Sequence, residues 1–329
     1  MKNPTALTIN LEDGGGGYKS WLLIRQLRKF LSVKTGWQHQ QDDAAVYPLG
    51  KNNLVFTTDA FIVDPLFFPG GDIGKIAVCG TINDLAVMGA KPLGLSLSMV
   101  IEEGFPRGAL FKIMKSIDQM SRVVRVPIVT GDTKVMDKGK LDKIIITTAG
   151  IGLAEKIISN DGAQVGDLII TSGDLGEHTV ALLSTRFDYK TQIKSDSRPL
   201  CQELEAVGKY LKACKDPTRG GLAANIAEIA DKSKVKIILE EKNLPFKKET
   251  VALSELLGID IFSFASEGRF IAAIAPQRAG LVIKKLKRFN PQAKIIGRAE
   301  KGKGVFLKTG LGGLRSIEMP RGKLIPRIC

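Results

Sequence analysis

The apolar residues of the first half of the chain recur at spacings that predict helices alternating with short strands. An amphipathic stripe predicts a helix at residues 18–31, and a second stripe, of Leu110, Ile113, Met114, Ile117 and Met120, predicts one at 107–123. The segment 73–88 is apolar on nearly every face, which predicts a buried helix. Short apolar runs bounded by turn residues predict strands at residues 54–58, 92–101, 126–130 and 141–150.

The second half of the chain has the same alternating character. Its patterns predict strands at residues 168–172, 236–240, 269–275, 293–299 and 304–308, and helices at 198–214, 221–231 and 277–289. The stretch from about residue 154 to 166, which contains Asn160-Asp161-Gly162, is typical of a linker. Because 329 residues are more than one core usually holds, we expect a mixed α/β (α+β) protein of two domains.

Glycine and proline mark both ends of the chain. Residues 1–35 combine the glycine-rich loop Asp13-Gly-Gly-Gly-Gly with the first helix, and the two domains are expected at 36–155 and 156–312. Residues 313–329 contain Gly313, Pro320, Gly322 and Pro326, a pattern too broken for helix or sheet, so we predict an extended, mobile tail that ends on the thiol of Cys329. From the residues alone an ordinary frayed terminus remains the alternative.

Composition narrows the class of protein. Hydrophobic residues make up 44% of the chain, no stretch approaches the roughly 20 apolar residues of a membrane span, and the first residues lack the apolar core of an export signal. The four cysteines show no CxxC spacing, which favours a reducing cytoplasm without a zinc site or disulfides. The net charge of +14 is scattered, without interleaved aromatics, so we expect phosphate ligands or an acidic partner rather than nucleic acid, and no membrane.

Two loops could bind anions. Four consecutive glycines at 14–17 precede the first helix, and Asp216-Pro-Thr-Arg-Gly-Gly places Arg219 and Gly220 at the start of another. Backbone N–H groups at helix starts attract phosphate. Neither loop matches a P-loop, and a flexible leader and ordinary helix-entry chemistry remain equally open interpretations.

Four aspartates are placed where a fold could gather them. Asp43 precedes a strand, Asp59 ends one, Asp84 lies in the C-terminal half of the apolar helix, and Asp132 follows the predicted strand 126–130. A buried carboxylate near a helix C-terminus needs a cation or several donors. Carboxylate-only sites suit Mg²⁺, which also binds nucleotide phosphates. The set therefore predicts a magnesium-nucleotide site, with Lys134 beside the last member; the carboxylate of Glu267, in Ser266-Glu-Gly, taken alone indicates only a turn.

Several longer phrases occur in an order that resembles one known family. They are Asp64-Pro-Leu-Phe-Phe-Pro-Gly-Gly, Cys79-Gly-Thr-Ile-Asn-Asp-Leu-Ala-Val-Met-Gly-Ala, Val129-Thr-Gly-Asp-Thr-Lys-Val, Asp216-Pro-Thr-Arg-Gly-Gly and Pro326-Arg-Ile-Cys. They resemble the HypE family of hydrogenase maturation factors, in the PurM-like superfamily of aminoimidazole ribonucleotide synthetase and selenophosphate synthetase. Two positions depart from its pattern: Asp13 stands where a histidine is usual before the glycines, and Ser266 where an asparagine is usual.

The resemblance implies a two-domain PurM-like ATP-binding fold and a homodimer whose N-terminal sheets join. It implies a carbamoyl dehydratase: a HypF-type carbamoyltransferase loads Cys329, ATP dehydrates the carboxamide to a thiocyanate, and a HypC–HypD scaffold receives the cyanide for the iron of NiFe hydrogenase. The roles that it implies for individual residues are as follows: Cys329 carries the substrate, Lys134 and Glu267 neutralise charge and take protons, Asp43, Asp59, Asp84 and Asp132 hold Mg²⁺ and ATP, and Thr133, Arg219 and Gly220 bind the nucleotide.

Two other functions compete with this interpretation. A sister synthetase or kinase of the same superfamily, acting on a free small molecule, would keep the aspartates but would not need Cys329. A nucleic-acid-binding module would explain the net charge of +14 and would bind in a salt-dependent way.

Overall fold

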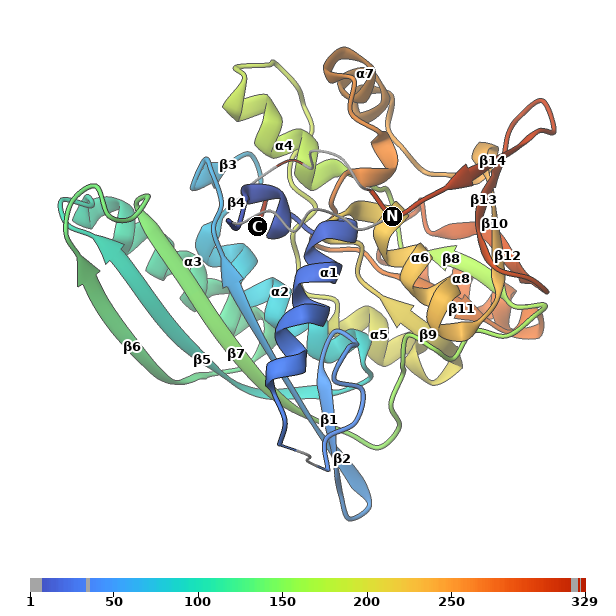
Figure 1. Cartoon of the computed structure of the whole chain (residues 1–329), viewed down its shortest axis with the longest axis horizontal. Helices are drawn as coiled ribbons and strands as arrows, with labels where there is room; N and C mark the ends of the chain where they lie inside the picture. The colour runs from blue at the N-terminus through green and yellow to red at the C-terminus, as the bar shows by residue number, and fades with distance from the viewer. Residues whose placement is uncertain (1–7, 34–35, 321–324, 326) are drawn as a thin grey trace.

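The computed structural model describes residues 8–33, 36–320, 325 and 327–329. Its first sheet has five strands in the order β1-β2-β7-β5-β6, all of them antiparallel to their neighbours except the parallel pair β5 and β6 (Figure 1). The strands are β1 (Ala45–Leu49), β2 (Asn52–Phe61), β5 (Lys91–Glu102), β6 (Ile128–Met136) and β7 (Ile144–Ala154). A short hairpin of β3 (Phe67–Phe68) and β4 (Gly71–Asp72) follows β2.

Helix α2 (Ile73–Val87) forms the core of this half of the molecule. It packs on β2 and β7, and α3 (Arg107–Val124) packs on α2 in turn. Nearly every side chain of α2 is buried, as its all-round apolar pattern predicts. Asp72 caps the helix by accepting a hydrogen bond from the Lys75 backbone N–H at 3.0 Å.

The second sheet has seven strands in the order β14-β13-β10-β12-β8-β11-β9. They are β8 (Leu168–Thr171), β9 (Leu211–Lys215), β10 (Lys236–Glu240), β11 (Ile271–Ile274), β12 (Lys294–Glu300), β13 (Gly304–Lys308) and β14 (Leu314–Ile317). Its helices are α4 (Glu177–Arg186), α5 (Cys201–Val207), α6 (Gly221–Ser233), α7 (Lys248–Leu257) and α8 (Pro276–Leu286). Helix α1 (Gly17–Leu27) lies in front of the junction between the two sheets (Figure 1).

Most expected elements are present, and two differ. The predicted helix 198–214 is wrong: α5 ends at Val207, and β9 follows because it pairs with the buried strand β11. The strand predicted at 126–130 instead runs to Met136, since its pairing with β5 continues through Ser98 and Asp132. Asp132 therefore lies inside a strand and not in a turn after one. Between β7 and β8 the chain has no helix or strand, only an isolated bridge from Ser159 to Ala213.

The described part of the C-terminal segment contains a strand, β14. The expectation that it is too broken for a strand is wrong, because β14 pairs with β13. Residues 321–324 and 326, which include Gly322 and Pro326 of the expected tail, lie outside the described residues. At the end of the described residues, Ile328 is buried in the apolar core that contains α2. The Ile62 N–H donates to the Cys329 carbonyl at 3.1 Å. Mobility of the tail stays a prediction.

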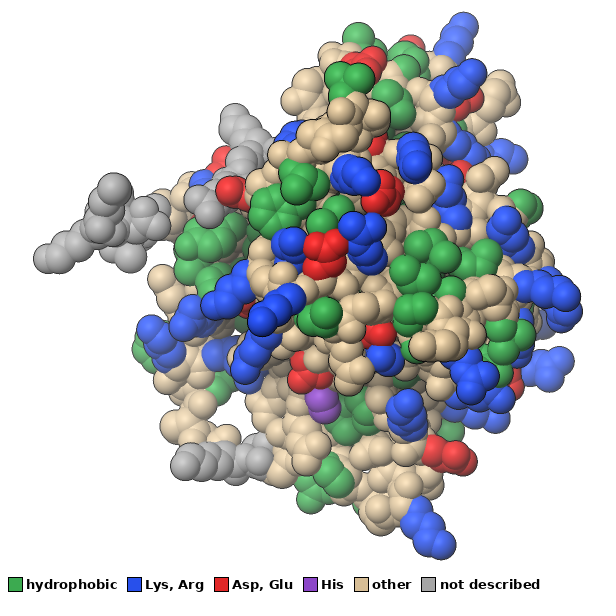
Figure 2. All heavy atoms as spheres, turned by 90° about the vertical axis from the view of Figure 1, so that its right-hand side faces the viewer, with side chains coloured by type: hydrophobic (Ala, Val, Ile, Leu, Met, Phe, Trp, Pro, Cys, Tyr) green, Lys and Arg blue, Asp and Glu red, His purple; other side chains and the backbone are tan. Residues whose placement is uncertain are grey.

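Basic and acidic side chains are intermixed on the face of the molecule that carries the second sheet (Figure 2). Figure 2 shows basic side chains distributed among acidic and hydrophobic ones on the face that carries the second sheet, in keeping with the scattered pattern of the sequence. Within the described part of the chain, no helix has both the length and the apolar character that crossing a bilayer requires.

Candidate active site

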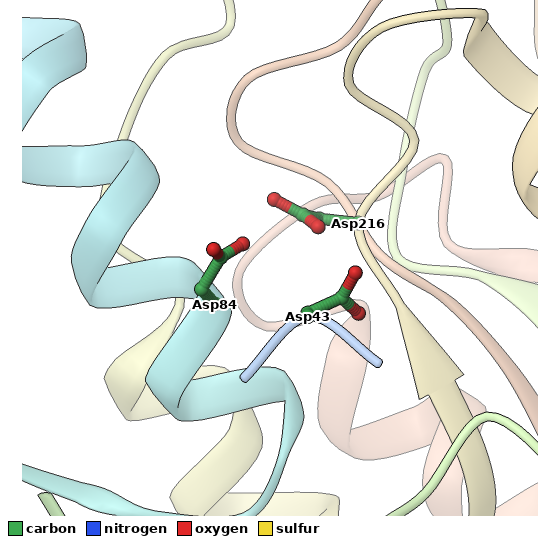
Figure 3. Close-up of side chains that lie close together, drawn as sticks. All are labelled: Asp43, Asp84 and Asp216. Carbon is green, nitrogen blue, oxygen red and sulfur yellow. The ribbon is translucent and has the colours of Figure 1, made fainter. Parts of the chain in front are cut away.

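Three carboxylates from distant parts of the chain converge between the two sheets. Asp43 lies two residues before β1, Asp84 lies on α2, and Asp216 directly follows β9. One oxygen of each lies within 4.8 Å of the others, and Figure 3 shows the three side chains close together, with those of Asp84 and Asp216 facing each other and Asp43 below them. The structure thus brings together two of the predicted aspartates, and it adds Asp216, which the sequence analysis treated only as part of a helix-entry loop.

Asp59 lies at the edge of this cluster. Its Oδ2 accepts a hydrogen bond from the Thr81 hydroxyl at 3.0 Å, and burial raises its pKa. Thr57, two residues earlier on β2, donates its hydroxyl to Asp84 Oδ2 at 2.9 Å. Thr57 and Asp59 alternate along β2, so both point to the face of the sheet that α2 covers, where Thr57 bonds Asp84 and Asp59 bonds Thr81.

Burial and mutual repulsion raise the pKa values of these carboxyl groups. Burial raises the pKa of Asp43 to about 6, although the Lys215 ammonium lowers it in part. Burial, with the added charge of Asp43, raises the pKa of Asp216 to about 8. The pKa of Asp84 rises well above its usual range because of burial and then the charge of Asp59. The raised pKa values show that negative charge on these carboxylates is unfavourable in the protein alone. A bound cation would offset that charge.

The donor set fits Mg²⁺. All three ligand atoms are carboxylate oxygens, the type of ligand that Mg²⁺ takes from proteins. Among the described residues, Asp43 Oδ2 and Asp216 Oδ2 are buried and have no hydrogen-bond partner. Buried oxygens without donors are free to coordinate a metal. Lys215, a residue that the sequence analysis did not single out, pairs with Asp43 and lies 3.5 Å from Glu228.

The last residue of the sequence reaches the edge of this carboxylate cluster. The charges of Glu267, Arg219 and Asp59 all act on the Cys329 thiol, whose pKa is raised first by burial and next by Glu267. In the reverse direction, the Cys329 thiolate is the largest influence that raises the pKa of Arg219. Cys329, Glu267 and Arg219, from three separate segments, therefore form one group beside the aspartates.

The loop that carries Glu267 is held from two sides. Its backbone N–H donates to Asp196 Oδ1 at 2.9 Å, and its carbonyl accepts from Asn83 Nδ2 at 3.1 Å. Burial raises the pKa of Glu267 well above its usual range, and the charges of Asp216 and Asp196 add to the rise. Its Oε1 has no hydrogen-bond partner among the described residues. The two adjacent polar residues in the C-terminal half of α2 therefore have different parts. Asn83 positions Glu267, and Asp84 joins the carboxylate cluster.

The two glycine loops of the sequence lie against each other. A Cβ on Gly16 would approach the Cβ of Arg219 to 2.8 Å, and Arg219 Nη1 donates to the Gly14 carbonyl at 3.4 Å. Gly16 and Gly220 both have positive φ, and each immediately precedes a helix, α1 and α6. Two helix N-termini therefore open beside Arg219, an arrangement that favours a polyanion.

Three of the predicted site residues lie on β6 and not at the carboxylate cluster. Asp132, Thr133 and Lys134 lie on β6, the edge strand of the first sheet, and Asp132 pairs with Lys134 at 3.1 Å with both side chains exposed. Within one described chain, the structure does not bring Asp132 to the carboxylate cluster. The unusual Asp13 is used locally, because its Oδ2 accepts the Asn10 backbone N–H at 2.7 Å.

Comparisons with known proteins agree with this geometry. Residues 41–154 match the N-terminal domain of AIR synthase related proteins, and residues 164–310 match their C-terminal domain. A carbamoyl dehydratase HypE from Rhizobium leguminosarum bv. viciae is 40% identical over 98% of this chain and 95% of its own length.

Solved structures give the same result. A HypE–HypF complex contains a chain that is 38% identical, with a TM-score of 0.85 over 91% of this chain and 99% of that one. HypE in complex with ATP is 34% identical, with a TM-score of 0.82 over 98% of this chain and 100% of that one. Both domains, the near-complete coverage and the converging carboxylates place the chain in one family. It belongs to the AIR synthase related proteins and, within them, to the HypE family.

Proposed function

We propose that this protein is an ATP-dependent carbamoyl dehydratase of hydrogenase maturation. It converts a carboxamide on the Cys329 sulfur into a thiocyanate, the source of cyanide for the iron of NiFe hydrogenase. The observation that carries the proposal is that Cys329 is docked by its backbone and packed against the core, where the charges of Glu267 and Arg219 act on its thiol. The names of its relatives, which include carbamoyl dehydratase and hydrogenase expression and formation proteins, support the same activity.

The reaction needs a better leaving group than an amide oxygen. In the proposed step the carboxamide oxygen bonds to the γ-phosphorus of ATP and the bond to ADP breaks. The C–O bond then breaks, phosphate departs with the former amide oxygen, and the nitrogen loses both of its hydrogens as the C≡N bond forms. Such a phosphoryl transfer relies on positioning and on stabilisation of negative charge rather than on a protein nucleophile.

Each group of residues has a distinct part in this scheme. Asp43, Asp84 and Asp216, with Asp59 beside them, would hold Mg²⁺, which supplies positive charge to the phosphates. Arg219 would bind phosphate beside the starts of α1 and α6 and offset the charge that develops near the thiol. ATP binding by a HypE structure that aligns over nearly the whole chain supports the nucleotide assignment.

Glu267 is the proposed proton acceptor. It is 2% exposed, and the raised pKa makes its ionised form a stronger base than an ordinary carboxylate. The positive charges of Arg219 and of a bound cation would favour that ionised form when the site is loaded. The free Oε1 could then take a proton from the carboxamide nitrogen.

A second copy of the chain would supply Asp132, Thr133 and Lys134. The strand β6 that carries them has exposed side chains along almost all of its length, although it includes the apolar residues Val129 and Val135. An edge strand with unpaired backbone groups is a ready surface for pairing. We therefore assign a homodimer in which β6 faces the partner, with the nucleotide close to that interface.

The proposed partners follow from the reaction. A HypF-type carbamoyltransferase would load Cys329, as the HypE–HypF complex of a relative supports, and a HypC–HypD scaffold would accept the cyanide. A sister enzyme that acts on a free small molecule is the second candidate. Its activity would not depend on Cys329.

Mass spectrometry of the C-terminal peptide tests the proposal. Incubation with a HypF-type carbamoyltransferase, carbamoyl phosphate and ATP should add a carboxamide to Cys329, and that mass should then fall by one water as ADP forms. Cys214→Ser, which removes a buried cysteine of β9 outside the tail, is the control and should give the same masses. Steady ATP turnover by Cys329→Ser on a small-molecule substrate would instead support the sister-enzyme function.

A further inference from the structure

A buried histidine on α4 contacts the C-terminal segment. His178 is fully buried, and its Nε2 lies 2.7 Å from the carbonyl oxygen of Ile328, the residue before the cysteine. Its Nδ1 lies 2.8 Å from the hydroxyl of Ser195. The carboxylate cluster and its neighbours Glu267 and Arg219 do not use this side chain.

The partners of the ring fix its protonation. A carbonyl oxygen only accepts hydrogen bonds, so Nε2 carries the hydrogen and donates it to Ile328. Burial lowers the pKa of His178 to about 4, so the ring is neutral at physiological pH and Nδ1 is an acceptor. The Ser195 hydroxyl donates to Nδ1 while its oxygen accepts the Ser197 backbone N–H at 3.1 Å. The three bonds therefore run in one direction and leave one tautomer.

The surroundings hold this chain of hydrogen bonds in place. The Ser195 backbone N–H donates to the Pro69 carbonyl at 2.8 Å, and a Cβ on Gly70 would approach the Ser195 nitrogen to 2.8 Å. Gly70 also has a φ of +93°, which disfavours any other residue. The ring of Phe68 meets His178 edge to face, with centroids 5.3 Å apart. The Pro- and Gly-rich loop after β2 therefore packs against His178 and Ser195 and holds both in position.

Neighbouring residues also form hydrogen bonds to the backbone of the tail. Arg186, at the other end of α4, donates to the Arg327 carbonyl at 3.1 Å. The backbone N–H groups of Ile62 and Asp64 donate to the carbonyls of Cys329 and Arg327, each at 3.1 Å. None of these bonds uses the sulfur. The cysteine side chain is therefore left to carry a group while the backbone around it is held.

We propose that His178 is a positioning residue that latches the tail: its Nε2–H, kept in that tautomer by Ser195, holds the Ile328 carbonyl and so fixes the backbone of the adjacent Cys329. The latch rests on the proposed function for its purpose, because a cysteine that visits other proteins has to return to one defined position. A single substitution at His178 can remove the hydrogen bond from Nε2 to the buried Ile328 carbonyl.

Two substitutions separate the hydrogen bond from the packing. His178→Phe keeps an aromatic ring against Phe68 and removes the donor, whereas His178→Gln keeps an N–H near the position of Nε2. The readout is the rate at which iodoacetamide alkylates Cys329 in the full-length protein without ATP, followed on the peptide that a lysine-specific protease releases after Lys323. Loss of a bond to a buried acceptor should speed alkylation about tenfold in His178→Phe, with His178→Gln close to the wild-type rate.

Ser195→Ala and Ser184→Ala complete the experiment. Ser195→Ala removes the group that fixes the tautomer and should speed alkylation less than His178→Phe does. Ser184, also on α4, donates its hydroxyl to the Ala181 carbonyl of its own helix and contacts no described residue of the tail by a hydrogen bond, so Ser184→Ala should alkylate like the wild type. Should His178→Phe fail to fold, a faster rate in Ser195→Ala still supports the latch and an unchanged rate overturns it.

Wild-type alkylation in His178→Phe, or equal acceleration by Phe and Gln, would overturn the proposal. The second result would mean that the histidine only fills space. Because alkylation without ATP does not require dehydration, these outcomes leave the proposed function untouched. Failure of dehydration in wild-type protein would contradict that function and not the latch.

Discussion

Replacing Asp216 by asparagine removes the carboxylate whose pKa is raised to about 8 by burial and by Asp43. The side chain is 3% exposed and follows β9 directly, so asparagine can occupy the same space. If Asp216 is held in the protein at the expense of stability, as a metal ligand would be, the neutral variant should be the more stable one. The cost should depend on pH.

The sign and size of the effect follow from the pKa. An unfolded aspartate titrates near pH 3.9, so between about pH 4 and pH 8 unfolding releases a proton that the folded state retains. The free energy of unfolding therefore falls as pH rises through this window, by roughly 5 kcal/mol for a difference of about four pH units. Asp216→Asn lacks this loss. Its Tm should exceed that of wild type by roughly 10 °C at about pH 8.5 and match it near pH 4.

Thermal unfolding in EDTA across this pH range measures the difference. Asp118→Asn is the matched control, because Asp118 lies on α3, is 60% exposed, and within the described part of the chain pairs with Arg122 one turn away. It should shift the Tm by little at any pH. With Mg²⁺ and ATP the wild type should recover its lost stability while Asp216→Asn gains less, since the cation replaces the protons. A variant that keeps the wild-type pH slope in EDTA would refute the reasoning.

Three further predictions concern other parts of the site. Glu267→Gln should slow dehydration by about 100-fold or more in single-turnover assays, without affecting carbamoylation of Cys329, and equal rates would exclude Glu267 as the base. Gly16→Ala should weaken ATP binding measured by calorimetry because its Cβ meets Arg219, whereas Gly139→Ala, with similar positive φ but open space, should not; equal losses would contradict the packing argument. Val135→Lys on β6 should yield monomers in light scattering, while the comparably exposed Val165→Lys should leave dimers, and dimeric Val135→Lys would exclude β6 as the interface.

The parts of the fold that the sequence predicted are those with a strong local pattern. Helix α2 was evident because its residues are apolar on every face, and α3 because its stripe keeps helical spacing. Helix α4 was missed because it is buried together with polar residues such as His178, so no stripe stands out. Strand β9 was read as helix because Leu204, Val207 and Leu211 keep helical spacing, and only its pairing with β11 decides the outcome.

The same distinction applies to the site. Asp84 was predicted because a carboxylate near the end of an apolar helix lacks a local explanation. Asp216 was overlooked because an Asp-Pro pair before a helix has a local explanation, as an ordinary turn that leads into the helix. No sequence rule links Ile328 to His178, which are 150 residues apart, so the docked tail could be found only from the structure. The β6 residues were placed at a turn because the run 126–130 gave no sign that pairing with β5 continues.

The central claim is that the cargo of Cys329 loses its oxygen to phosphate at this site. The most direct test loads Cys329 with a carboxamide labelled with the heavy oxygen isotope and follows the label during a single turnover with unlabelled ATP. The account predicts that inorganic phosphate carries the label in step with the loss of one water from the C-terminal peptide. Label released as water, with unlabelled phosphate, would contradict it.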